Sequence, residues 1–191
     1  MKKTFLLFSL IGIIFFGCSD NSDNTNISAP TSINNLTKDQ IFTSDQEIES
    51  ASHILSISKL IDGESGGELL IDTAYTNYQG RQIEVYGKLT IKQSAFQGSE
   101  YITMKLNPES ATIKFFPEMV FEKDVKLSVT YTGIDLVALG YTTSGHYDFV
   151  FFGKGGIETT LNDESKVDMD KQEIKVKNAK LEHFSRYGWM K

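Results

Sequence analysis

A two-residue alternation of apolar and polar side chains constrains this chain more than any other feature. In the run at 82–91, Ile83, Val85 and Leu89 fall on one face, and Gly87 occupies the position between Val85 and Leu89 on that face. Successive side chains of a β-strand point to opposite faces, so this period is typical of strands with one buried face. The same alternation recurs at 102–106, 113–115, 125–131, 167–169 and 174–176.

Turn signals separate these runs. They are Asp62-Gly63, Gly66-Gly67, Gln97-Gly98, Asn107-Pro108, Gly153-Lys154-Gly155-Gly156 and Asn162-Asp163. Many short strands joined by such turns predict an all-β fold, an antiparallel β-sandwich. The run at 147–153, YDFVFFG, is apolar on both faces, which predicts a central strand followed by a hairpin. The alternation at 181–189 predicts one closing strand.

The N-terminal stretch has the composition of a targeting segment. Lys2 and Lys3 precede an apolar run at 5–16, which is shorter than the roughly 20 residues that span a membrane. The run ends at Gly17-Cys18, the site of the only cysteine. This ending resembles the lipobox of bacterial lipoproteins, although Phe15 and Phe16 depart from its usual Leu and small residue. The resemblance implies a signal peptide at 1–17 and a diacylglycerol on Cys18; the alternative is an ordinary secretory signal.

Acylation of Cys18 would anchor the chain to the membrane of a bacterial cell envelope. Ser19, rather than Asp, follows the cysteine, and by resemblance to enterobacterial lipoproteins this favours the outer membrane. Residues 18–45 are rich in Ser, Asn, Asp and Thr, which predicts a flexible tether. The domain at 46–191 follows, and a capping box at 44–47 predicts a short helix over 45–53.

Charge and motif content exclude several function classes. The formal net charge is −6, and removal of the leader, with its two lysines, would make the chain more negative. Nucleic acid is therefore a poor partner, because its phosphates favour basic proteins. His53, His146 and His183 are too far apart in sequence to suggest a zinc site. Asp168 and Asp170 share a strand face, which we interpret as a solvated face rather than a calcium site. We expect no metal, no cofactor and no enzymatic activity.

Three stretches together resemble the ZU-five sandwich domain of zonula-occludens proteins, ankyrins and netrin receptors. They are Gly66-Gly67-Glu68-Leu69, the run KFFPEMVFEKDVKLSVTY at 114–131, and the terminal His-Phe-Ser-Arg-Tyr at 183–187. The resemblance covers about residues 57–190 and departs from the family at 91–95. It implies a β-sandwich module with a structural or recognition role, whose partner is an envelope protein or a glycan.

Two alternatives to that role stay open. Some proteins cleave themselves within a His-Phe-Ser triplet, with the serine as nucleophile and the histidine as base. Here this would cut between Phe184 and Ser185 with His183 as the base; otherwise the triplet belongs to the closing strand. A carbohydrate-binding module is the other alternative, with Tyr75, Tyr78 and Tyr86 as candidate contacts; this role requires the three rings to be exposed and coplanar.

Overall fold

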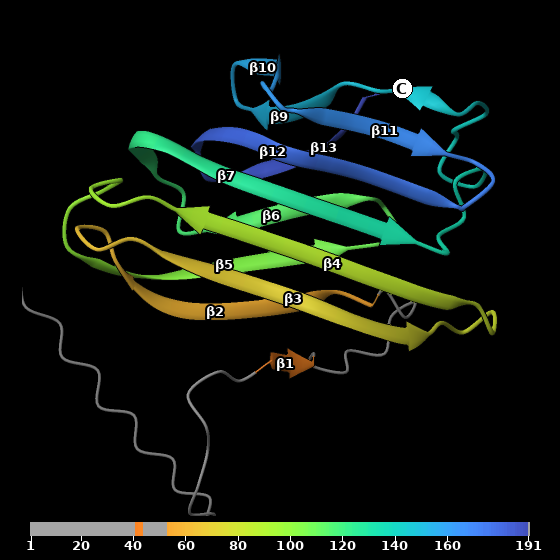
Figure 1. The fold of residues 1–191 in the computed structure, drawn as a ribbon, viewed down its shortest axis with the longest axis horizontal. Helices are drawn as coiled ribbons and strands as arrows, with labels where there is room; N and C mark the ends of the chain where they lie inside the picture. The colour runs from red at the N-terminus through yellow and green to blue at the C-terminus, as the bar shows by residue number, and fades with distance from the viewer. Residues whose placement is uncertain (1–40, 44–52, 191) are drawn as a thin grey trace, which may run out of the picture. The chain divides into compact units, whose positions relative to one another are not determined.

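The computed structural model describes residues 41–43 and 53–190. Within these residues the chain forms strands without a helix, and two antiparallel sheets pack against each other (Figure 1). The predicted β-sandwich is therefore confirmed. The predicted signal peptide at 1–17 and Cys18 lie outside the described residues. So does the predicted helix at 45–53, apart from His53.

The first sheet, called sheet A here, holds seven of the described strands. In spatial order they are β1 (Ile41–Thr43), β2 (Leu55–Asp62), β5 (Ser99–Asn107), β6 (Thr112–Phe116), β13 (Arg186–Trp189), β9 (Phe149–Gly153) and β10 (Gly156–Thr159). The short β1 pairs with β2 and falls inside residues 18–45, the predicted tether. The rest of that stretch lies outside the described residues.

The second sheet, sheet B, holds six of the described strands. In spatial order they are β3 (Gly67–Thr76), β4 (Gln82–Ile91), β7 (Val120–Thr132), β12 (Glu173–His183), β11 (Glu164–Asp168) and β8 (Gly145–His146). Figure 1 shows β3, β4, β7 and β12 side by side in front of sheet A.

The core lies between the sheets and is built from the alternating residues. Val125, Leu127, Val129 and Tyr131 of β7 are all fully buried, as the period predicts. Gly87 of β4 belongs to the same inner face. A β-carbon added at Gly87 would lie 2.5 Å from the Leu106 side chain of the opposite sheet. Glycine therefore lets the two sheets approach at this point.

The strand predicted to be central is β9, an interior strand of sheet A that pairs with β13 on one side and with β10 on the other. β9 lies one place from the edge of sheet A, with only β10 beyond it. Phe149 and Val150 are buried, but Phe151 and Phe152 are only half-buried. Both faces of β9 are apolar because the Phe152 ring covers Gly188 of β13 on the outer face. The hairpin predicted at Gly153–Gly156 does join β9 to β10.

The prediction of a single closing strand at 181–189 is wrong. β12 ends at His183 in sheet B, and β13 begins at Arg186 in sheet A. Between them the Phe184 N–H donates to the Met119 carbonyl at 2.7 Å, and its ring stacks on Phe115 at 4.6 Å. Because Phe184 turns into the core, the two-residue phase breaks, and the chain crosses from one sheet to the other.

Candidate functional site

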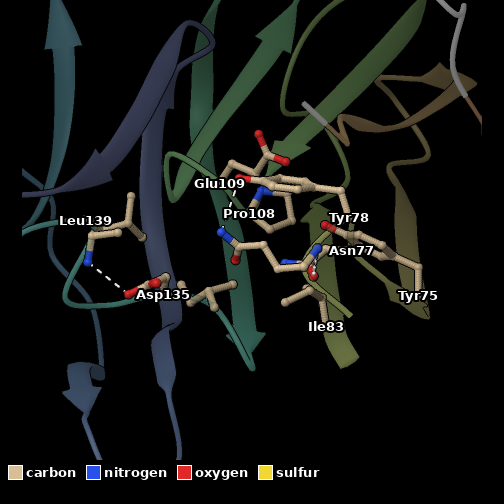
Figure 2. A pocket seen from close by; sticks show the side chains of 11 residues that line it. Tyr75, Asn77, Tyr78, Ile83, Pro108, Glu109, Asp135 and Leu139 are labelled. Atoms are coloured by element: carbon tan, nitrogen blue, oxygen red, sulfur yellow. Dashed lines mark hydrogen bonds between the residues drawn. The ribbon is translucent and has the colours of Figure 1, made fainter. Parts of the chain in front are cut away.

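A groove of about 250 Å³ opens where three loops of the sandwich meet (Figure 2). One wall comes from the β3–β4 hairpin, with Tyr75, Asn77, Tyr78 and Gln79. The turn after β5 adds Pro108 and Glu109, and the loop after β7 adds Ile134, Asp135, Ala138 and Leu139. The groove thus combines aromatic, amide and carboxylate side chains from the β3–β4 hairpin and from the loops after β5 and β7.

The β3–β4 hairpin is shaped by Asn77. Its side-chain oxygen accepts hydrogen bonds from the backbone N–H groups of Gln79 (3.0 Å) and Arg81 (2.9 Å). Gly80 takes a positive φ of 76°, which only glycine adopts without strain. This turn leaves the Tyr78 side chain 73% exposed, beside Pro108 and Glu109 in Figure 2. The Gln79 amide donates to the Tyr78 hydroxyl at 3.3 Å.

The facing wall is fixed by Asp135. One of its carboxylate oxygens accepts the Ala138 N–H at 2.9 Å, and the other pairs with the Arg81 guanidinium at 2.9 Å. These contacts, led by the Ala138 hydrogen bond, hold the pKa of Asp135 below its ordinary value of 3.8. Asp135 therefore stays ionised and joins the β7 loop to the hairpin. We therefore assign Asp135 a structural role, which is to fix the shape of the groove.

Tyr75 supplies a neutral hydroxyl at the inner side of the groove. Its ring stacks on His53 with centroids 4.6 Å apart. Partial burial, and then the nearby Glu109 carboxylate, raise the pKa of Tyr75 to about 12. The hydroxyl therefore keeps its proton at neutral pH and can donate a hydrogen bond. Together with the exposed Tyr78 ring and the Glu109 carboxylate, it makes the groove suitable for a polar ligand with an apolar face.

Tyr86 lies elsewhere. It is 37% exposed on the outer face of sheet B, opposite Asp72 on β3 and Thr130 on β7. Tyr75 is paired with the buried Ile83, so it has the opposite, inward orientation. The groove therefore brings Tyr75 and Tyr78 together, and the three-tyrosine set expected for a glycan platform does not form.

His183 and Ser185 flank the crossing between the sheets. The His183 ring packs 4.9 Å from the Phe151 ring, and the Tyr187 hydroxyl donates to the His183 carbonyl. The Ser185 carbonyl accepts the Phe115 N–H at 2.8 Å. In the described part of the chain, no hydrogen bond joins the His183 imidazole to the Ser185 hydroxyl. The structure places the two residues of the self-cleavage alternative near each other without pairing them.

The remaining candidate ligands stay apart. His53 stacks on Tyr75, and His146 lies 3.5 Å from the Asp148 carboxylate on the surface. Asp168 accepts the Lys171 N–H at 3.1 Å and closes the turn after β11. Within residues 53–190, no group of three or more His, Cys, Asp or Glu residues is arranged to hold a metal ion. In the same range, no helix has the length and apolar character needed to cross a membrane.

Comparison with known proteins gave no family model, no curated protein and no solved structure that matches this chain. The resemblance to the ZU-five domain stays a prediction from its three motifs.

Proposed function

We propose that this chain is a non-catalytic lipoprotein of a bacterial cell envelope, and that its sandwich is a recognition module. The observation that carries the proposal is the lone cysteine, Cys18, at the end of a charged and then apolar leader. Its partners are the membrane, through the lipid on Cys18, and an envelope protein or glycan bound by the domain. The outer membrane is the proposed location.

The groove in Figure 2 supports the recognition role. Its two walls are held by the Arg81–Asp135 ion pair and by the hydrogen bonds of Asn77, which are formed within the protein. A pocket that is already shaped loses little entropy when a ligand enters. Tyr78 and Glu109 then remain exposed for contact with the partner.

Labelling of growing cells with a fatty acid tests the anchor. The wild-type protein should incorporate the label, and Cys18→Ala should not, because the acceptor thiol is gone. Mass spectrometry of the mature protein should find Cys18 at its N-terminus. Equal labelling of both proteins, or a mature N-terminus at another residue, would refute lipidation of Cys18.

Glycan binding in the groove is the second candidate. The exposed Tyr78 ring favours it, because sugars stack their C–H faces on aromatic rings, and polar groups nearby fix their hydroxyls. Asn77, Gln79, Glu109 and the Tyr75 hydroxyl line the same space and offer donors and acceptors.

A titration with soluble oligosaccharides from the envelope tests the glycan candidate. Tyr78→Ala should weaken binding about fivefold or more, since stacking on a ring contributes on the order of 1 kcal/mol. Tyr86→Ala is the matched control, because its ring is exposed outside the groove, and it should bind as the wild type does. A similar loss in both variants would place the sugar elsewhere, and no binding by the wild type would reject this candidate.

A further inference from the structure

Three cationic side chains form a row across the outer face of sheet A. Lys105 on β5 pairs with Lys114 on β6, and Lys114 pairs with Arg186 on β13. Directly paired residues of neighbouring strands point to the same face, so the three charges lie side by side. All three residues are exposed. The next positions along the row are Phe152 on β9 and Ile157 on β10.

Two of these three cations contact aromatic rings. The Lys105 ammonium lies 5.6 Å from the centroid of the Phe116 ring, and the Arg186 guanidinium lies 4.9 Å from that of Phe152. In the described residues, none of the three cations belongs to an ion pair.

Negative charge is scarce on this face. At the outward positions of β2, β5, β6, β13, β9 and β10, Asp62 is the one carboxylate among the described residues. Its oxygens accept hydrogen bonds from the Glu64 N–H and the Ser65 hydroxyl in its own turn. Glu118 lies in the turn after β6 and lines a separate hollow, on the face of sheet A, together with Lys114 and Arg186. The row is therefore positive within a chain whose net charge is −6.

Exposed apolar side chains surround the row. Phe116 is 45% exposed and Tyr101 is 67% exposed, and both lie on sheet A. Leu60 of β2 and Ile157 of β10 are more than half exposed, and they extend the apolar surface toward both edges of the sheet. Neighbouring exposed apolar side chains on one face are typical of interaction surfaces.

We propose that the outer face of sheet A docks on the anionic surface of a lipid bilayer. Cations beside aromatic and aliphatic side chains are the composition of membrane-interface surfaces, where Lys and Arg are attracted to anionic lipid headgroups. A symmetric contact with a second copy is disfavoured, because it would bring the same row of cations against itself.

The length of the N-terminal segment permits this contact. Residues 19–40 separate Cys18 from β1, which is paired with β2, and at about 3.3–3.6 Å per residue they would span roughly 75 Å when extended. A lipid on Cys18 would thus leave any face of the sandwich within reach of the bilayer. The docking proposal uses the proposed anchor only for this proximity, so the test below removes the anchor.

The experiment is vesicle flotation with purified full-length protein that carries Cys18→Ser in every variant. The vesicles contain phosphatidylglycerol mixed with phosphatidylcholine, or phosphatidylcholine alone. The triple variant Lys105→Gln, Lys114→Gln, Arg186→Gln should bind the anionic vesicles at least about tenfold more weakly than its parent. The parent's preference for anionic vesicles should fall as salt rises. All variants share residues 1–52, so those residues contribute equally.

A matched triple variant controls for net charge. Lys92→Gln, Lys126→Gln and Lys177→Gln remove the same charge at positions outside this face and should leave binding unchanged. Lys105→Arg with Lys114→Arg keeps the charge and should also bind like the parent. Equal loss in the two Gln variants, or no loss in either, would overturn the proposal. So would tight binding to a soluble anionic polysaccharide without binding to vesicles, which would identify a glycan as the partner.

Discussion

The outer faces of the two sheets use charged residues in opposite ways. On sheet B, lysines pair with carboxylates of neighbouring strands, as in Lys88–Glu68 at 2.8 Å and Lys175–Glu164 at 3.0 Å. On sheet A, Lys105 and Arg186 lie against aromatic rings. Both faces follow from the same alternation of inward and outward residues. Sheet B therefore pairs its surface charges with one another, whereas the cations of sheet A make no ion pair in the described residues, and this is the difference on which the docking proposal rests.

The first prediction tests the core between the two sheets, on which we expect the stability of the fold to depend more than on either outer face. The Tyr187 ring is buried between the sheets, stacked on Phe149 with centroids 5.8 Å apart. Tyr187→Ala should lower the free energy of unfolding by about 3–5 kcal/mol, because a large buried side chain is lost. Tyr187→Phe should cost about 1 kcal/mol, the value of the hydrogen bond to the His183 carbonyl. Denaturant unfolding measures both, and a loss below 1 kcal/mol for Tyr187→Ala would contradict the assigned core.

The second prediction compares the two faces directly. Glu164 bridges Lys175 at 3.0 Å and Lys166 at 3.6 Å on sheet B. Glu164→Gln should destabilise the fold by about 0.5–1 kcal/mol, since exposed ion pairs contribute little. Lys105→Gln on sheet A should change stability by less than about 0.5 kcal/mol, because no carboxylate loses its partner. A larger loss of stability for Lys105→Gln than for Glu164→Gln would contradict this comparison of the two faces.

The third prediction concerns pH. A hydrogen bond from Lys175, and then the charges of both lysines, hold the pKa of Glu164 below its ordinary value of 4.5. The folded state therefore favours the ionised carboxylate, so this stabilisation is complete well above pH 4.5 and is lost as pH falls through the folded pKa. The stability difference between the wild type and Glu164→Gln should shrink in acid below about pH 4.5. A difference that stays constant down to pH 3 would show that the ion pairs contribute nothing.

The smallest effect is expected at the crossing between the sheets. The Ser185 side chain makes no hydrogen bond within the described residues, so Ser185→Ala should cost less than about 0.5 kcal/mol. The Phe184–Ser185 bond should stay intact, because His183 is not paired with that hydroxyl. The intact mass of the denatured protein checks this. A species ending at Phe184 that disappears in Ser185→Ala would establish the self-cleavage alternative instead.

Much of the fold follows from the local pattern, whereas the arrangement of the faces depends on distant pairings. The alternation predicted the inward residues of β4, β5, β6 and β7, because period two is a property of each strand alone. The break at Phe184 was missed, because its cause is the packing of its ring on Phe115, far away in sequence. The pairing of β9 with β13 was not predictable for a similar reason, since the two strands lie far apart in the sequence.

The candidate site was predictable only in part. The sequence predicted Tyr75 and Tyr78 as candidate ligand contacts and Asn107-Pro108 as a turn. Glu109 and Asp135 were missed, because the groove forms only when the loops after β5 and β7 meet the β3–β4 hairpin. The cationic row was missed as well, since the pairing of β6 with β13 brings Arg186 beside Lys114. Local signals in the sequence carry no information on that register.

Amine-reactive footprinting of the native protein in isolated envelopes tests the difference between the two faces most directly. Lys105 and Lys114 report on sheet A, and Lys126 and Lys177 report on sheet B. If sheet A faces the bilayer, Lys105 and Lys114 should react slowly in envelopes and become more reactive after detergent extraction. Lys126 and Lys177 should react at similar rates in both states. Equal protection of all four lysines, or protection of the sheet B pair alone, would contradict the account.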